Sequence, residues 1–173
     1  QSVLPLILSL LIGGALGEFM RLDQRVESLG DFLKERLRSK NEQFTEGFVI
    51  ASVLFCVGAM AIVGSIEEGL KGDASLLYTK ALLDGFAAMV LASTYGIGVL
   101  FSAFPILLYQ GGLTLSAASF QRFTSPLMMD QLSAVGGLLI VGIAFNLLDI
   151  KKINVANLLP AIFVVIVLTV LGS

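Results

Sequence analysis

The sequence predicts an all-α polytopic membrane protein, a bundle of transmembrane helices. Hydrophobic residues make up 56% of its 173 residues and charged residues 14%, whereas charged residues average roughly 25% in soluble proteins. A run of 37 residues, 85–121, contains no Asp, Glu, Lys or Arg. A membrane-crossing helix needs about 20 apolar residues, so this run is long enough for nearly two. The apolar stretches are continuous, which favours helices over the alternating strands of a barrel.

Six apolar stretches predict about six spans within a single transmembrane domain, residues 1–173. They cover residues 3–20, 48–66, 76–95, 97–120, 132–148 and 155–172. The first lacks the basic segment and the cleavage site of a signal peptide. The third and fourth divide the charge-free run at Tyr95-Gly96-Ile97-Gly98, where glycines permit a turn. Because the chain opens at Gln1 almost directly into a span, we expect that an upstream segment is missing.

The basic residues predict the orientation, since cytoplasmic loops are enriched in Lys and Arg. The loop after the first span and the loop between the fifth and sixth hold eight of them: Arg21, Arg25, Lys34, Arg36, Arg38, Lys40, Lys151 and Lys152. The alternate loops hold two, Lys71 and Arg122. We therefore expect the basic loops to be cytoplasmic and both chain ends to face outward.

Residues 21–40 predict a cytoplasmic amphipathic helix. Apolar residues recur there at steps of three and four, at Leu22, Val26, Leu29, Leu33 and Leu37, which is one face of a helix. Such a helix lies on the membrane surface or packs under the bundle. The alternative is a regulatory or partner-binding element.

The first and last spans resemble each other. Residues 4–17 and 159–172 share five identities at one offset, beginning with a Leu-Pro pair in each. The predicted topology runs these spans in opposite directions, which suggests an inverted-topology repeat of the kind found in secondary transporters. Chance similarity between two Leu-rich helices is the open alternative.

Lys80 and Asp84 are the charged pair inside the third span. Asp84 lies close to the predicted bilayer middle, where a carboxylate costs at least about 2.5 kcal/mol. Lys80 is one helical turn away and can neutralise it. The pair is either a cation or proton site or a self-neutralising ion pair that reaches the outer interface.

The fourth span predicts a helix break. Pro105 should kink it, and Gly111 and Gly112 after Gln110 should weaken it further. Broken transmembrane helices build transporter sites, so Gln110, Gly111 and Gly112 join Lys80 and Asp84 as candidate solute- or ion-binding residues. The alternative is a packing notch with Gln110 as a contact between helices.

Other small and polar residues have structural interpretations. Close helix packing is expected at Gly13, Gly14, Gly17, Gly58, Gly64, Gly136, Gly137 and Gly142. We interpret Asn146 and Asn157 as turn or cap residues and Cys56 as a core residue. The chain has no His, so His-dependent catalytic sites are absent; we expect no enzyme, metal or cofactor. A basic face for nucleic acid is absent too.

Several motifs resemble one bacterial family. They are Glu46-Gly47-Phe48, Leu54-Phe55-Cys56-Val57-Gly58-Ala59-Met60-Ala61-Ile62-Val63-Gly64-Ser65, Thr79-Lys80-x3-Asp84-Gly85, Gly98-Val99-Leu100-Phe101-Ser102, Tyr109-Gln110-Gly111 and Val155-Ala156-Asn157-Leu158-Leu159-Pro160-Ala161. The sequence resembles the inner-membrane proteins of domain-of-unknown-function family 554, the YdfK/YqgA type. The resemblance implies a polytopic protein of the bacterial inner membrane, often taken to be a transporter, with about two further spans upstream. It carries over no functional residue.

These observations favour an integral membrane transporter or channel for a small solute or ion, acting in the lipid bilayer as a homodimer, the commonest oligomer. The alternative is a non-transporting scaffold or sensor that works through the amphipathic helix at 21–40.

Overall fold

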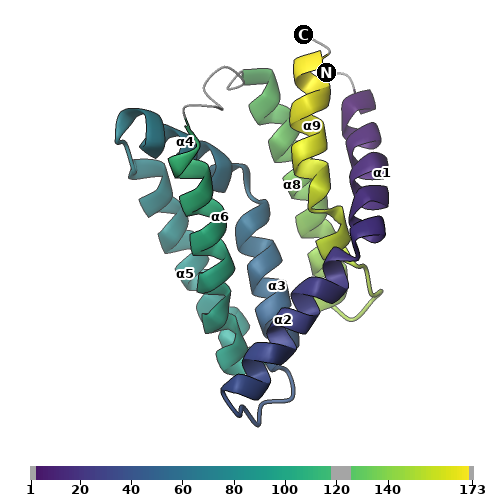
Figure 1. The fold of residues 1–173 in the computed structure, drawn as a ribbon, viewed down its shortest axis with the longest axis vertical. Coiled ribbons are helices and arrows are strands. Elements are labelled where there is room, and N and C mark those ends of the chain that lie inside the picture. Colours follow the sequence, from purple (N-terminus) through teal and green to yellow (C-terminus); the bar gives the residue numbers. More distant parts are fainter. Residues whose placement is uncertain (1–2, 118–125, 172–173) are drawn as a thin grey trace. The chain divides into compact units, whose positions relative to one another are not determined.

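The computed structural model describes residues 3–117 and 126–171, and their regular structure is entirely helical, which confirms the all-α prediction. The elements are α1 (Val3–Met20), α2 (Leu22–Arg36), α3 (Phe44–Val57), α4 (Ala59–Lys71), α5 (Ser75–Tyr95), η1 (Gly96–Ser102), α6 (Ala103–Leu115), α8 (Pro126–Leu147), η3 (Val155–Leu158) and α9 (Pro160–Leu171). They form two compact units (Figure 1). Unit 1 holds α1, α8, η3, α9 and residues 57–59; unit 2 holds α2 from Gln24 onward, α3, α4, α5, η1 and α6.

Three of the described segments are long and apolar enough to cross a membrane. They are α1, the 41-residue segment Ser75–Leu115, and α8. The pair α3 and α4 is a fourth if it forms one bent span. Residues 3–117 and 126–171 therefore contain three to four candidate spans by length and composition, fewer than the six that the sequence predicts.

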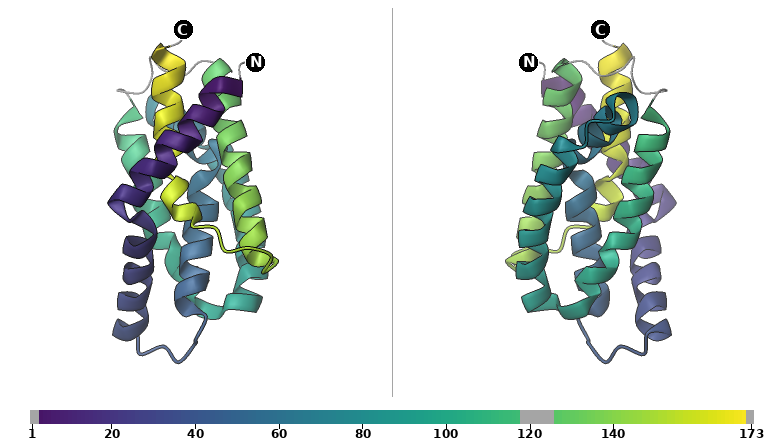
Figure 2. Two further views of the ribbon diagram at one scale, coloured as in Figure 1. Left: turned by 90° about the vertical axis from the view of Figure 1, so that its right-hand side faces the viewer. Right: turned by 90° about the vertical axis from the view of Figure 1, so that its left-hand side faces the viewer.

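The segment Ser75–Leu115 reverses direction within its length. A straight helix of 41 residues would extend roughly 60 Å, twice the hydrocarbon thickness of a bilayer. Instead α5 ends at Tyr95, and Gly96 takes a positive φ of 73° that favours glycine. α5 and α6 then run in opposite directions on either side of η1 (Figure 2). The turn predicted at Tyr95-Gly96-Ile97-Gly98 is confirmed.

Unit 1 is built on a close crossing of α1 with η3 and α9. A Cβ at Gly13 would overlap the backbone of Ala161, and one at Gly17 would overlap the backbone of Asn157. Only glycine permits this approach, so the packing role predicted for both positions is confirmed. α1 and α9 run antiparallel, with the beginning of α1 and the end of α9 at the same end of the unit (Figure 1).

Unit 2 joins the α5–η1 turn to the beginning of α3. A Cβ at Gly98 would overlap the backbone of Phe44, whose ring centroid lies 5.5 Å from that of Phe101. Asn41 Nδ2 donates a hydrogen bond of 3.0 Å to the Tyr95 carbonyl at the C-terminal end of α5. The turn between α5 and α6 is thereby fixed on α3.

The second predicted span is broken. α3 ends at Val57 and α4 begins at Ala59, with a 60° bend between them. A Cβ at Gly58 would meet no atom within 4 Å, so Gly58 marks the break and is not a packing residue. The prediction of one span over 48–66 needs this correction, because a continuous apolar pattern does not report a change of direction.

The break predicted in the fourth span is not there. α6 continues through Gly111 and Gly112 to Leu115. Pro105 is the third residue of α6, where its missing N–H breaks no α-helical hydrogen bond. The irregular segment is η1, which precedes the proline, and residues 118–120 of this predicted span lie outside the described residues.

The amphipathic helix predicted at 21–40 corresponds to α2, which ends earlier, at Arg36. Within unit 2 it packs on α3: a Cβ at Gly30 would lie 2.9 Å from the Thr45 side chain and 3.0 Å from that of Phe48. Thr45 Oγ1 donates a hydrogen bond of 2.6 Å to Asp31 Oδ1 across the same contact. α2 is therefore held against α3 by both shape and a hydrogen bond.

Candidate functional site

The ion pair between Lys80 and Asp84 is the centre of the candidate site. Lys80 Nζ donates to Asp84 Oδ2 along α5, as their spacing of four residues predicts. The Lys80 side chain is 7% exposed and that of Asp84 28%. Asp84 lies roughly 14 Å along the 21-residue helix from Ser75, close to its middle. A charged pair is thus held at mid-helix, with its ammonium group almost fully enclosed.

Electrostatic interactions relate two further polar side chains of unit 2 to this pair, Cys56 directly and Tyr109 through Cys56. Cys56, in the last turn of α3, lies close enough to Lys80 and Asp84 for their charges to act on it. Tyr109, on α6, interacts electrostatically with Cys56 in turn. We call Cys56, Lys80, Asp84 and Tyr109 the polar cluster; it joins α3, α5 and α6 just before the break at Gly58.

Two hydrogen-bonding atoms on α6 are buried without a partner among the described residues. They are Tyr109 Oη and Gln110 Nε2. Burying an unpaired donor costs about 1–3 kcal/mol, and native proteins retain few such groups. The two atoms therefore mark α6 as the side of the polar cluster with unused hydrogen-bonding capacity.

The other predicted site residues take different places. No hydrogen bond or ion pair of the described part of the chain joins Gln110 to Lys80 or Asp84; Tyr109, its neighbour, is the link to the cluster through Cys56. At Gly111 and Gly112 a Cβ would meet nothing within 4 Å. These two glycines do not serve close packing, and they continue α6 instead of breaking it.

The polar cluster has the chemistry of a binding site for a small polar species. It contains one ammonium, one carboxylate, a thiol and a phenol, with a carboxamide adjacent on α6. Within residues 3–117 and 126–171 no group of three or more Cys, Asp or Glu side chains could hold a metal ion. Hydrogen bonding and charge are therefore the means of recognition that this cluster offers.

A polar contact farther along unit 2 connects α4 with α6. Thr114 Oγ1 donates a hydrogen bond of 3.4 Å to Glu68 Oε2. A Cβ at Gly69 would overlap the Thr114 carbonyl, so α4 and α6 approach closely here. Thr114 lies one turn beyond Gln110 on α6, and the polar residues of this helix thus extend from the cluster toward its C-terminal end.

In unit 1, Asn157 forms a separate polar contact that has a structural role. Its Nδ2 donates to Glu18 Oε2 and its Oδ1 accepts from the Asp23 backbone N–H, both at 2.7 Å. It thereby caps α2, which confirms the cap prediction. Burial, with the neighbouring Glu18 carboxylate, raises the pKa of Asp23. Asn146 closes the 146–153 turn through two hydrogen bonds to the backbone of Ile153, as predicted.

Sequence reasoning found the pair in α5 and missed two members of the polar cluster. Cys56 reads as a core residue within an apolar run, and Tyr109 is a single aromatic in a charge-free span. The available signal was local: a tyrosine beside a glutamine within 37 residues that carry no charge. Neither residue could be placed beside Lys80 without the packing of α3, α5 and α6.

Comparisons with known proteins place the chain in a family. Residues 1–170 match the family model described as "Protein of unknown function (DUF554)". The chain is 36% identical over 159 residues to the uncharacterized membrane protein YdfK of Bacillus subtilis strain 168, covering 91% of this chain and 66% of the relative. It is also 36% identical over 162 residues to the uncharacterized protein YqgA of Escherichia coli K12, covering 91% and 69%.

The chain spans about two thirds of the length of these curated relatives. No solved structure matches it. The family match over residues 1–170 and the similarity to a named membrane protein agree with its apolar helices. The chain belongs to the DUF554 family of proteins of unknown function.

Proposed function

We propose that this protein is a transporter or channel for a small solute or ion in the bacterial inner membrane. The observation that carries the proposal is the pair of unpartnered donors, Tyr109 Oη and Gln110 Nε2, buried on α6 beside the polar cluster. A purely structural ion pair needs no such donors. A binding site does, because its donors are satisfied when the solute arrives.

The broken helix next to the polar cluster supports the same proposal. Discontinuous membrane helices commonly form the solute sites of transporters, because their free backbone groups must face protein or water. Cys56 lies two residues before Gly58, where α3 and α4 bend by 60°. The proposed site is therefore Lys80, Asp84, Tyr109 and Gln110. At Gly111 and Gly112, the next residues of α6, a Cβ would meet no atom within 4 Å.

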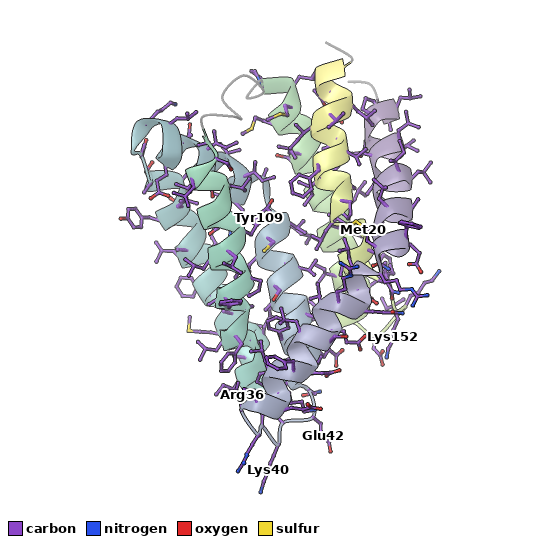
Figure 3. All side chains as sticks on the ribbon, viewed as in Figure 1. Met20, Arg36, Lys40, Glu42, Tyr109 and Lys152 are labelled. Atoms are coloured by element: carbon purple, nitrogen blue, oxygen red, sulfur yellow. The ribbon has the colours of Figure 1, made fainter. Side chains whose placement is uncertain are left out.

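We further propose about six crossings, with the basic loops in the cytoplasm and both ends of this chain outside. The arrangement within each unit supports this. In unit 2, Arg36 and Lys40 lie at the end where η1 joins α5 to α6 (Figures 1 and 3). In unit 1, Lys152 lies at the end opposite the beginning of α1 and the end of α9 (Figure 3). Basic residues thus gather at one end of each unit, as the positive-inside rule requires.

Two finer proposals concern symmetry and assembly. The antiparallel course of α1 and α9, which meet at Gly13, supports an inverted-topology relation between them. A homodimer is proposed because two-fold assemblies are the commonest.

The alternative function, a scaffold or sensor acting through α2, has weaker support. The contacts of Gly30 and Asp31 hold α2 on α3, so α2 is a fixed part of unit 2 and not a free arm. We propose no enzymatic role, because the sequence has no His to act as the base of a Ser-His or Cys-His pair.

Transport by the full-length protein tests the proposal. Purified protein is reconstituted in liposomes, and currents on a solid-supported membrane are recorded for a panel of small ions and polar solutes. We expect a saturable signal that Tyr109→Phe and Gln110→Leu abolish. Tyr78→Phe is the matched control, because Tyr78 is 71% exposed on α5. A signal that survives both cluster variants would contradict the proposed site.

A further inference from the structure

We infer that one face of α2 binds the anionic phospholipid head groups of the membrane surface. The face consists of four side chains, Arg25, Leu29, Phe32 and Arg36, which we call the α2 stripe. The inference concerns a surface outside the polar cluster and does not depend on the transport role proposed above. It uses the proposed topology alone, which brings α2 to the cytoplasmic leaflet.

The α2 stripe follows from the spacing of its members. They occur at steps of four, three and four residues within Leu22–Arg36, and successive residues of an α-helix are rotated by about 100°. The four side chains therefore fall within about 60° of one another around the helix axis. Phe32 is 60% exposed and Leu29 39%, and both arginines are exposed as well. The stripe is thus a continuous open face of unit 2.

α3 holds α2 from another side. Gly30, which packs on α3, lies at least about 100° around the helix axis from the α2 stripe. Val26 and Leu33, two members of the apolar face that the sequence periodicity predicts, are half-buried. Phe32 is outside that periodicity and is the most exposed apolar residue of α2. The face left open for a partner is therefore rotated from the apolar face that the periodicity predicts.

The charges of α2 are segregated around the helix. Its four acidic residues occur at steps of four, and this row lies at least about 60° from the α2 stripe. They are Asp23, Glu27, Asp31 and Glu35. The two ion pairs of the described part of the chain involve neither Arg25 nor Arg36. The α2 stripe therefore presents two uncompensated guanidinium groups on either side of two exposed apolar side chains.

An anionic bilayer surface complements this arrangement. A helix in the membrane interface buries its apolar side chains at the boundary between head groups and acyl chains, with Lys or Arg beside them. A guanidinium group binds phosphate with two parallel hydrogen bonds, and its long stem lets the charge reach the head group while Leu29 and Phe32 contact acyl chains. α2 begins directly after the candidate span Val3–Met20, so the chain itself brings this helix to the membrane surface.

A fluorescent reporter beside the α2 stripe tests the inference. Ser28→Cys, in a Cys56→Ser background, is labelled with bimane as the only cysteine of the full-length protein. Ser28 is exposed and lies one turn before Phe32, outside the stripe. The protein is reconstituted in phosphatidylcholine liposomes that contain phosphatidylglycerol or phosphatidylcholine with a nitroxide near the head group. Quenching at increasing fractions of each nitroxide lipid gives the ratio of the two binding constants.

We expect the reporter at position 28 to favour phosphatidylglycerol over phosphatidylcholine by at least about fivefold, the effect of one basic residue near an anionic surface. Arg25→Gln/Arg36→Gln should remove this preference. Lys151→Gln/Lys152→Gln is the matched control, because it removes two exposed positive charges of unit 1, also on the proposed cytoplasmic side. It should leave the preference unchanged.

Two further measurements separate apolar contact from charge and check folding. Leu29→Ser/Phe32→Ser should lower the quenching by both lipids equally, because it removes the apolar contact and keeps both arginines. A second reporter, at Leu107→Cys in the same background, reports the lipid around α6, because Leu107 is 71% exposed. It should be quenched by both lipids without preference, and to the same extent in every variant that folds.

The outcomes decide the inference independently of transport. If neither lipid quenches the reporter at position 28 while both quench the reporter at 107, the α2 stripe faces water or a protein partner and the inference is wrong. Equal quenching by the two lipids would overturn the recognition of anionic head groups. A preference that the Lys151/Lys152 control removes as well would come from general charge attraction and would equally overturn the α2 stripe. Absence of the transport currents described above would leave each of these results unchanged.

Discussion

Variants of the Lys80–Asp84 pair distinguish a role of the ion pair in stability from a role in transport. Asp84→Asn keeps the shape of the side chain and leaves the Lys80 ammonium, 7% exposed, without its counter-charge. Removing one partner of a buried ion pair costs about 3–5 kcal/mol. Lys80→Met should cost less, because the Asp84 side chain that remains is 28% exposed.

The double variant Lys80→Met/Asp84→Asn provides the test of coupling. A buried pair replaced by neutral groups of similar volume is often close to neutral in stability, so the double variant should unfold within about 1 kcal/mol of the wild type. The single variants would then fail to add by about 3 kcal/mol or more. Unfolding of all four proteins in mixed micelles with increasing SDS measures this difference.

Transport currents of the same four proteins complete the experiment. If Asp84 couples the solute to protons or cations, the double variant regains stability but not ion-driven transport. Additive effects on stability would refute the ion pair as a coupled unit. Full transport by a folded Asp84→Asn protein would remove Asp84 from the mechanism and leave Gln110 with Gly111 and Gly112 as the remaining candidates.

Three further predictions concern topology, packing and assembly. Single cysteines at Ser39 and Lys151, in a Cys56→Ser background, should resist impermeant thiol reagents in intact cells; labelling of both from outside would reverse the orientation. Gly17→Ala should lower the free energy of unfolding by about 1–3 kcal/mol, since its Cβ would overlap Asn157, whereas Gly112→Ala, with open space, should raise it by about 0.4–1 kcal/mol; equal effects would contradict the packing. The full-length protein in native-like lipid should have the mass of a dimer, and a monomer at all concentrations would exclude it.

The helix bounds that the sequence predicted well are those marked by local chemistry. The first span was predicted at 3–20 and is observed as Val3–Met20, because a charged segment begins directly after it. α5 ends at Tyr95, where Gly96 permits a conformation that other residues avoid. The Lys80–Asp84 contact also follows from sequence alone, because residues four apart share a helix face.

The features that sequence reasoning missed depend on tertiary packing. The helix bends at Gly58 although the sequence around it is continuously apolar. No proline or charged residue there indicates the bend. The opposite error occurred at Gly111 and Gly112. They predicted a helix break, but α6 continues through them. The electrostatic interactions of Cys56 with Lys80 and with Tyr109 involve three helices, and hydropathy does not report which faces of helices meet.

Cys56 offers the most direct test of the central claim, that the polar cluster is a solute site reached by water. It is the only cysteine of the chain and lies among the charges of Lys80 and Asp84. A thiol reacts as the thiolate, which forms only where water reaches it.

The measurement is the rate of modification of Cys56 by a small charged methanethiosulfonate reagent in the full-length protein in liposomes. The comparison is Leu107→Cys in a Cys56→Ser background, because Leu107 on α6 is 71% exposed. The account predicts that Cys56 reacts and that the cysteine at 107, facing lipid, does not. Cys56 as unreactive as the cysteine at 107 would mean a sealed bundle and would contradict the proposed site.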